Sequence, residues 1–315
     1  MFLKAKRLAT GSPEEDLAAS PFVSVSDCHG CESPCQDEDH PHYPSFLKIN
    51  QDMPLLYSVK PYTRHVLIST GKEDWESHID DDKSSLAYHL SRAIDDGQRQ
   101  IREATGDSPD RIILTNSSRK AEDWNGPGWQ VIVLPDQIVV NNVTADQCND
   151  FFEAFLKPSV GSVNLVVPAA PDVDAPGLGQ ASKAEITVGK TTFIASRWQP
   201  KAAIMICSHK RRDKRCGVTA PILKKEFTRI LRSKDLYGDC EGDVEIWMIS
   251  HIGGHKFAGN VIVHKTEGLA VWYGRVEPCH SQAIVEATVE RGEVIRELYR
   301  GSMNGSFDHQ KKIAW

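Results

Sequence analysis

Hydrophobic residues along the chain occur in strand-sized runs and in helical spacing, and the same order of elements appears twice. In the C-terminal half, an apolar run at 202–207 predicts a strand, and a helix follows in which apolar residues recur every three or four positions. Pro221 is expected in the first turn of this helix, where its missing N–H does no harm. The other elements predicted for this half are strands at 244–250, 260–264 and 269–276 and a helix at 281–290.

The N-terminal half repeats this order. Its predicted elements are a strand at 65–69, a helix at 84–103, strands at 111–115, 130–134 and 138–143, and a helix at 146–156. A strand, a crossover helix and a second strand require parallel pairing, and two closing strands with a final helix complete a thioredoxin-like α/β sandwich. We therefore predict an α/β protein built from two thioredoxin-like domains in tandem.

The domain boundaries follow from this repeat. We place a first domain at 56–158 and a second domain at 201–300. The Pro- and Gly-rich stretch at 159–200 is expected to be a linker with one or two short strands. Residues 1–55 form a partly irregular N-terminal segment with a cysteine cluster, and residues 301–315 are expected to be a flexible tail.

Composition excludes several classes of protein. The chain of 315 residues is 40% hydrophobic and 25% charged, as in a soluble globular protein, and no apolar run approaches the ~20 residues of a membrane span. The net charge of −6 argues against a nucleic-acid partner. Eight cysteines without a secretory signal favour a reducing compartment. We predict the cytosol, with the nucleus as a further compartment. A mitochondrial location is disfavoured because Glu14, Glu15 and Asp16 closely follow the basic N-terminus.

The candidate metal ligands are Cys207, Cys216, His251 and His255. Two thiolates and two imidazoles make a four-donor set for a metal. The two glycines between the histidines would cost roughly 2 kcal/mol relative to alanines inside a helix, so a tight loop is predicted instead of a zinc-protease helix. Judged by donor type, a structural zinc ion, an iron–sulfur cluster and a metal-free thiol site all stay open.

The internal repeat restricts these donors to one copy. Aligning the two halves places Ser69 opposite Cys207 and Ser117 near His251. Polar serines indicate loop positions at strand ends, so only the C-terminal domain is expected to carry metal ligands. The basic run at 210–215, between the cysteines, is interpreted either as a solvated loop or as a docking surface for an acidic redox partner.

The segment Cys207-x8-Cys216, together with His251-x-Gly-Gly-His255-x-x-Ala258-Gly259-Asn260, resembles the sucrase/ferredoxin-like family of thioredoxin-like ferredoxins. The resemblance implies a 2Fe–2S cluster with both thiolates on one iron and both imidazoles on the other. The short cysteine spacing of zinc fingers is absent. Cys207-Ser208-His209 matches the first Rieske box, but Cys279-His280 lacks the spacing of the second.

The implied cluster has consequences for charge. Two ferric ions and two sulfides carry +2, so two thiolates leave the oxidised cluster neutral, whereas four would leave it at −2. We therefore expect a reduction potential well above the ~−400 mV of plant-type ferredoxins, in the direction of −150 mV or higher. Because each bound imidazole keeps a second ring nitrogen, the potential should depend on pH. The predicted function is a non-enzymatic electron carrier or a redox sensor whose donor and acceptor proteins are unknown.

Two other functional classes stay open. A second cluster consists of Cys28, Cys31 and Cys35, with His40 and His42 nearby. Its Cys28 and Cys31 have the spacing of a dithiol, so the chain could be a thiol oxidoreductase. Alternatively, a zinc ion at the four-donor set could stabilise an interaction module without a redox role.

Other residues have narrower predicted roles. Cys148 is expected in the core and Cys279 beside a helix start. Arg275 is a candidate to balance the charge of a reduced cluster. Trp315 ends a polar tail that resembles the tails by which some clients reach the cytosolic iron–sulfur targeting machinery, which makes that machinery a candidate partner.

Overall fold

The computed structural model describes residues 22–23, 40–121, 126–163, 183–303 and 306. Within these residues, eleven strands form one mixed sheet, which confirms the predicted α/β class. The strand order across the sheet is β13-β11-β10-β8-β9-β3-β2-β4-β5-β7-β6. A separate parallel pair joins β1 (Phe22–Val23) to β12 (Val294–Ile295).

The N-terminal half forms one side of this sheet. Strands β2 (Arg64–Ser69) and β3 (Ile112–Ser117) are parallel because α2 (Leu86–Thr105) connects them as a crossover. Antiparallel strands extend the sheet in the order β4 (Trp129–Leu134), β5 (Ile138–Val143), β7 (Thr191–Arg197) and β6 (Ala184–Val188). A helical segment follows β5 and consists of η3 (Ala145–Gln147), α3 (Cys148–Phe151) and η4 (Phe152–Leu156). The β6–β7 hairpin supplies the short strands expected in the linker, and it continues the first half-sheet.

The C-terminal half repeats the parallel unit. Strands β8 (Ala202–Cys207) and β9 (Val244–Ile249) are parallel and are connected by α4 (Lys214–Ser233). The antiparallel strands on the other side of β8 are β10 (Val261–Lys265), β11 (Ala270–Tyr273) and β13 (Tyr299–Ser302). The remaining helical segments are η5 (His255–Phe257), α5 (His280–Ala283), η6 (Ile284–Glu290) and η7 (Arg296–Leu298).

The predicted start of α4 is wrong. The helix begins at Lys214, because the side chain of Asp213 caps it by accepting a hydrogen bond of 2.9 Å from the Arg215 backbone N–H. Pro221 therefore lies about two turns inside the helix, where it cannot donate to the carbonyl of Gly217. The earlier start has a consequence for the site, since it places Cys216 in the first turn.

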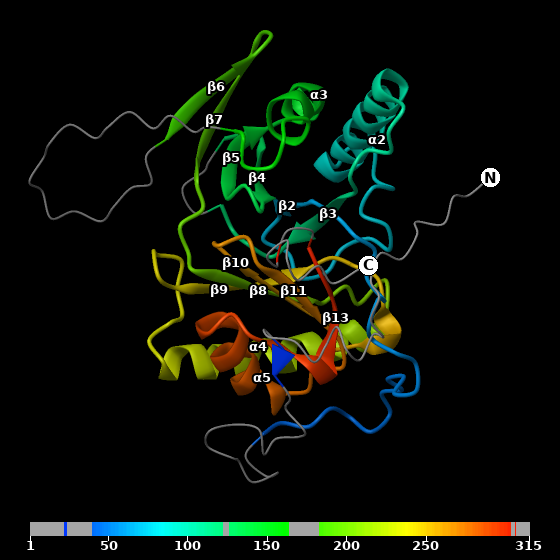
Figure 1. Cartoon of the computed structure of the whole chain (residues 1–315), viewed down its shortest axis with the longest axis vertical. Helices are drawn as coiled ribbons and strands as arrows, with labels where there is room; N and C mark the ends of the chain where they lie inside the picture. Colours follow the sequence, from blue (N-terminus) through cyan, green and yellow to red (C-terminus); the bar gives the residue numbers. More distant parts are fainter. Residues whose placement is uncertain (1–21, 24–39, 122–125, 164–182, 304–305, 307–315) are drawn as a thin grey trace, which may run out of the picture.

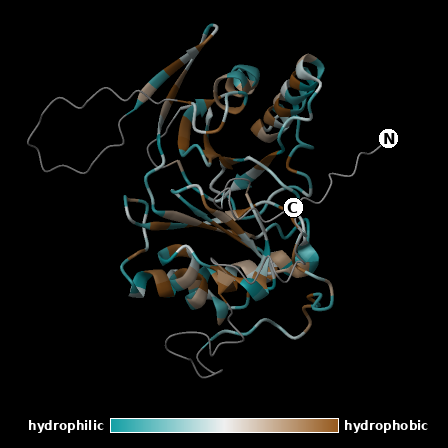
Figure 2. Cartoon of the chain, viewed as in Figure 1, coloured by the Kyte–Doolittle hydropathy of each residue, from teal (hydrophilic) through white to brown (hydrophobic). Residues whose placement is uncertain are grey.

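Helices cover only the outer side of each half-sheet. In Figure 1, α2 and α3 lie on one side of the molecule and α4 and α5 on the other, with β2, β3 and the strands of the C-terminal half between them and the β6–β7 hairpin beside α3. Along β2, Val66 and Ile68 pack toward the helices, whereas Leu67 belongs to a central cluster shared by both halves. Met205 and Ile262 enter this central cluster from the C-terminal half. Figure 2 shows hydrophobic residues on the strands and on parts of the helices.

The two halves meet at the ends of β3 and β9. Ser117 pairs with Ile249 in an antiparallel register, and the Ser250 backbone N–H donates to the Asn116 carbonyl at 2.9 Å. The Asn116 N–H in turn donates to Ser250 Oγ at 3.0 Å. The two predicted domains are thus joined through one sheet and one central core, and the loops after β2, β3, β8 and β9 come together.

Candidate metal centre

The two cysteines lie at the junction of β8 and α4. Cys207 is the last residue of β8, and its backbone N–H donates to the Asn260 carbonyl at 3.0 Å. Cys216 lies in the first turn of α4, where the helix dipole favours a thiolate. Both are free thiols and both are 1% exposed. The crossover from strand to helix therefore presents two buried sulfur atoms to the same loop region.

The two sulfur atoms share one negative charge more readily than they hold two. The Cys216 thiol donates to the Cys207 sulfur and lowers the pKa of Cys207 well below its usual range, and the His251 imidazole acts in the same direction. The pKa of Cys216 is raised, because its proton is held by Cys207 and because the group is buried. The buried pair therefore favours a single shared negative charge over two thiolates.

The histidines lie on the predicted tight loop. His251 follows the end of β9, and η5 begins at His255. Gly253 has a φ of 85° and Gly254 a φ of 72°, a left-handed conformation that explains the two glycines. The imidazole rings lie side by side, with centroids 5.4 Å apart and planes inclined by 34°. The loop thus presents both rings together, as the spacing predicts.

The environments of the two imidazoles differ. His251 Nδ1 is buried and has no hydrogen-bond partner in the described part of the chain, a state that is costly for a polar atom. The His255 side chain is 46% exposed, and its Nε2 lies 3.9 Å from Asp213 Oδ2. Partial burial lowers the pKa of His255, which favours the neutral ring. Neutral imidazole is the form that binds metals.

The four side chains form two pairs. Among the described residues, no group of three or more His, Cys, Asp or Glu side chains is arranged to hold one metal ion. Two thiols and two imidazoles, with an unpartnered His251 nitrogen, are donors that either a zinc ion or a 2Fe–2S cluster accepts.

His209 supports the 251–255 loop through hydrogen bonds. Its Nε2 lies 3.1 Å from the Trp75 carbonyl and 2.8 Å from the Glu76 carbonyl, so the ring proton is assigned to Nε2. Its Nδ1 then accepts the His251 backbone N–H at 3.1 Å. His209, the last residue of the segment Cys207-Ser208-His209, thus anchors the backbone of the 251–255 loop.

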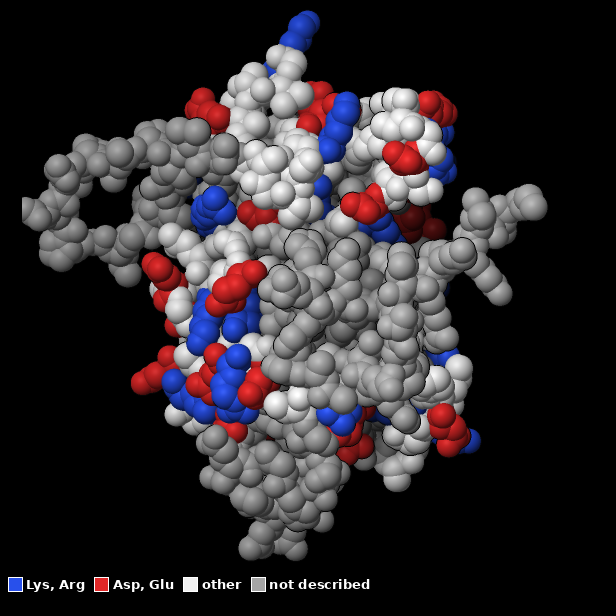
Figure 3. All heavy atoms as spheres, viewed as in Figure 1, with Lys and Arg blue, Asp and Glu red and all other residues white. Residues whose placement is uncertain are grey.

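The basic run at 210–215 is largely paired within the chain. Arg211 pairs with Glu76, and its backbone N–H donates to Asp74 at 3.1 Å. Arg215 pairs with Asp213 at 2.9 Å. The Arg211 contacts link the loop after β8 to the 73–78 loop of the first half. Figure 3 shows charges of both signs interspersed on the visible surface of the described residues.

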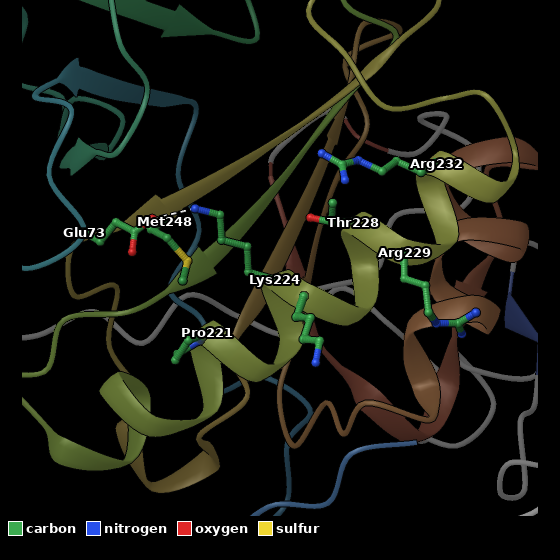
Figure 4. Close-up of a pocket in the computed structure, with 8 residues that line it drawn as sticks. Glu73, Pro221, Lys224, Thr228, Arg229, Arg232 and Met248 are labelled. Atoms are coloured by element: carbon green, nitrogen blue, oxygen red, sulfur yellow. Dashed lines mark hydrogen bonds and ion pairs between the residues drawn. The ribbon is translucent and has the colours of Figure 1, made fainter. Parts of the chain in front are cut away.

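A positively charged groove lies beside α4 (Figure 4). Lys224, Thr228 and Arg232 line it from successive turns of the helix, while Met248 of β9 lies opposite. Lys224 pairs with Glu73, and the cavity volume is about 530 Å³. Its lining includes none of the cysteines and histidines described above, so the groove is separate from the candidate metal centre.

The equivalent position in the first half has other chemistry. Ser69 Oγ donates to Gln130 at 3.3 Å, and Ser117 Oγ donates to the Ile68 carbonyl at 3.2 Å. Both serines form hydrogen bonds within the sheet. The neighbouring cavity at the ends of β2 and β3 is lined by residues other than cysteine and histidine. The candidate donors therefore belong to the C-terminal half.

Comparison with known families matches residues 55–301 to the sucrase/ferredoxin-like family. The chain belongs to this family. The family resemblance inferred from the Cys-x8-Cys and His-x-Gly-Gly-His segments is thereby confirmed. No solved structure matches the chain.

Several fungal proteins are similar to the chain, two of them over most of their length. Actin patches distal protein 1 of Saccharomyces cerevisiae is 30% identical over 288 residues, which are 86% of this chain and 85% of that protein. Altered inheritance of mitochondria protein 32 of Debaryomyces hansenii is 44% identical over 262 residues, 78% of this chain and 84% of that protein. The match to the protein of the same name from Meyerozyma guilliermondii is 43% identical over 103 residues, 33% of this chain and 35% of the relative.

The structure also locates several other residues that the sequence of this sucrase/ferredoxin-like chain singled out. Cys148 is buried as expected, and burial raises the pKa of its thiol to about 12. Cys279 is half-buried and directly precedes α5. His40 lies 3.0 Å from Glu226. Cys28, Cys31, Cys35 and Trp315 lie outside the described residues. In the part of the chain that is described, no helix is both long and apolar enough to cross a membrane.

Arg275 and Arg300 contact different parts of the structure. Arg275 donates to the carbonyls of Asn50 at 2.7 Å and Met53 at 2.6 Å, so it holds the segment before β2. Arg300 of β13, which the sequence analysis does not single out, lies near the two cysteines and the histidine loop. Arg300 lies on a short strand, and no local sequence pattern around it predicts this position.

Proposed function

We propose that Cys207, Cys216, His251 and His255 hold a 2Fe–2S cluster and that the protein is an electron carrier or a redox sensor. The observation that carries the proposal is the meeting of a buried thiol pair and an imidazole pair at the ends of β8 and β9. Family membership and the unpartnered Nδ1 of His251 support it. Such a cluster supplies reversible one-electron chemistry when bound.

The surrounding residues prepare the donors. The N-terminus of α4 favours ionisation of the cysteine pair, and His209 fixes the backbone from which His251 projects. Burial of both sulfurs excludes water from the thiolate side. The exposed ring of His255 provides a route by which a proton could pass between a ligand and solvent.

Anaerobic purification and metal analysis test the proposal. We expect wild-type protein to contain iron and acid-labile sulfide, to be red-brown, and to give an EPR signal after reduction. Replacing Cys207 or Cys216 with serine should remove most of the iron and colour, because a thiolate bond to iron is lost. Cys240 is free and exposed, so Cys240→Ser is the matched control and should keep wild-type iron. Wild-type iron and colour in both ligand variants would refute the assignment.

The alternatives give different results in the same preparation. A colourless protein with stoichiometric zinc would indicate the zinc-stabilised interaction module. Disulfide reductase activity lost in Cys28→Ser and Cys31→Ser, with no iron present, would indicate the thiol oxidoreductase. A reversible optical redox titration distinguishes an electron-transfer cluster from both.

The cytosolic location and the targeting partner are part of this proposal. We propose that Trp315 aids delivery of the cluster by the cytosolic iron–sulfur targeting machinery. Deletion of Trp315 should lower iron occupancy in cells, while the cluster reconstituted in vitro keeps its spectrum. Normal cellular occupancy would remove the targeting role, and lower thermal stability of the purified deletion would show that the indole stabilises its own domain.

A further inference from the structure

Arg300 is a buried cation with only neutral hydrogen-bond partners. The residue is 1% exposed. Its guanidinium donates to Asn260 Oδ1 at 2.7 Å, to Ser58 Oγ at 3.0 Å and to the Gly253 carbonyl at 3.4 Å. In the described part of the chain, no carboxylate forms an ion pair with it. Burial of a charge without an opposite charge is costly, so a counter-ion is expected nearby.

The cysteine-bearing end of β8 lies beside this cation, because Asn260 accepts from Arg300 through its side chain and from the Cys207 N–H through its backbone carbonyl. Burial lowers the pKa of Arg300 to about 10, whereas the charges of Cys207 and Cys216 raise it. The side chain therefore stays cationic at neutral pH. Both cysteines are themselves 1% exposed, so the interaction takes place away from water, where it is stronger than at the surface.

Arg300 also contacts the histidine loop. Besides its bond to the Gly253 carbonyl, it fixes the Asn260 side chain, whose Nδ2 donates to the Gly254 carbonyl at 3.0 Å. The Asn260 backbone carbonyl accepts the Cys207 N–H at 3.0 Å. One guanidinium is thus connected to both ligand-bearing segments. The approach is close, because a Cβ on Gly254 would lie 2.2 Å from Arg300 Nη2.

We propose that Arg300 is the fixed counter-cation of the cysteine pair and the brace of the 251–255 loop. It is a positioning residue that raises the reduction potential of the bound cluster. The effect on potential rests on the proposed function, because a cluster with two thiolates is neutral when oxidised and gains a negative charge on reduction. A buried cation stabilises that reduced state. The brace is a property of the protein with or without the cluster.

Redox titration separates the charge from the brace. Arg300→Gln removes the charge and should shift the potential to more negative values. Arg300→Lys keeps the charge and should leave the potential closer to wild type, although it loses the planar fork that reaches Gly253 and Asn260 together. Arg275→Gln is the matched control, because both guanidinium groups lie over the Phe257 ring, at 5.2 Å for Arg275 and 5.5 Å for Arg300. A wild-type potential in Arg300→Gln, or an equal shift in Arg275→Gln, would overturn the counter-cation role.

Hydrogen exchange of metal-free protein tests the brace independently. The loop amides of Phe257 and Ala258 donate to the Gly254 and His255 carbonyls at 2.8 and 3.1 Å. Both Arg300→Gln and Arg300→Lys should speed their exchange, while Arg275→Gln should not. Unchanged exchange in both Arg300 variants would overturn the brace. If wild-type protein binds no cluster, the proposed function fails, but this measurement still decides whether Arg300 holds the loop.

Discussion

At the scale of single residues, the site depends on backbone conformations that few side chains tolerate. Gly253 and Gly254 both have positive φ, yet their surroundings differ. Nothing lies within 4 Å of a Cβ added at Gly253, whereas a Cβ at Gly254 would meet Arg300. The pair therefore separates the effect of backbone strain from the effect of the arginine contact.

We expect Gly254→Ala to destabilise the metal-free protein more than Gly253→Ala. Each alanine carries the strain of a left-handed conformation, about 1–3 kcal/mol, and Gly254→Ala also displaces the guanidinium. Urea unfolding gives both free energies, and iron content should be lower in Gly254→Ala. Equal losses in the two variants would show that the Arg300 contact contributes little to the loop.

The histidines should set both the value and the pH dependence of the potential. We expect the double variant His251→Cys and His255→Cys, if it keeps a cluster, to have a lower potential, because two further thiolates make the cluster more negative. Its potential should vary less with pH between roughly 6 and 9, since no imidazole remains to titrate. An unchanged potential and slope would show that these imidazoles are not ligands.

At the scale of elements, helix caps position the chemistry. Ser85 caps α2 through a 3.1 Å bond from the Tyr88 N–H, and Asp213 caps α4 immediately before the cysteine-bearing turn. The bond from the Arg215 side chain lowers the pKa of Asp213. The carboxylate therefore contributes stability at neutral pH, and that contribution is lost as pH falls through its lowered pKa.

Removal of either cap should lower the free energy of unfolding by about 1 kcal/mol. Only removal of the Asp213 cap should affect the candidate metal centre. Asp213→Ala frees the Arg215 side chain and removes the carboxylate near His255. We expect urea unfolding to show similar losses for Asp213→Ala and Ser85→Ala, with iron occupancy reduced only in Asp213→Ala. Normal occupancy in Asp213→Ala would mean that the first turn of α4 holds Cys216 without its cap.

At the scale of the whole molecule, the two halves share a core that contains buried histidines. His65 and His264 are both fully buried, and burial lowers the pKa of each to about 3. His65 Nε2 contacts Thr115 Oγ1 at 2.8 Å, but both ring nitrogens of His264 lack partners among the described residues. The unfolded chain therefore binds protons that the folded chain excludes, so stability should fall as pH decreases from about 6.5 toward 3.

Replacement of His264 should reduce this acid sensitivity. For each such histidine, the protein loses up to about 1.4 kcal/mol of folding stability per pH unit below the pKa that the histidine has in the unfolded chain. His264→Phe keeps an aromatic ring beside Trp198, whose centroid lies 6.2 Å away, but cannot be protonated. Urea unfolding at pH 7 and pH 5 should show a smaller difference for the variant. An unchanged difference would mean that His264 is already protonated or exposed in the folded protein.

The local sequence determined the elements and the donor pairs. Strand runs such as 202–207 and the presence of a helix before β9 follow from periodicity that neighbouring residues define, and the structure has the strand at the predicted bounds. The histidine loop was predictable because paired glycines disfavour a helix whatever surrounds them. The start of α4 was not, because the Asp213 cap overrides the usual preference of Pro221 for a first turn.

Only the tertiary structure decided how distant segments meet. The pairing of β3 with β9 and the shared core depend on which faces of two similar half-sheets become buried together, and both halves carry the same alternation. Arg300, and not Arg275, lies beside the cysteines because it belongs to β13, a short strand late in the sequence that pairs with β11 at the edge of the sheet. Sequence periodicity predicts which face of a segment is buried. It does not predict the element against which that face packs, because many elements can pack against the same hydrophobic pattern.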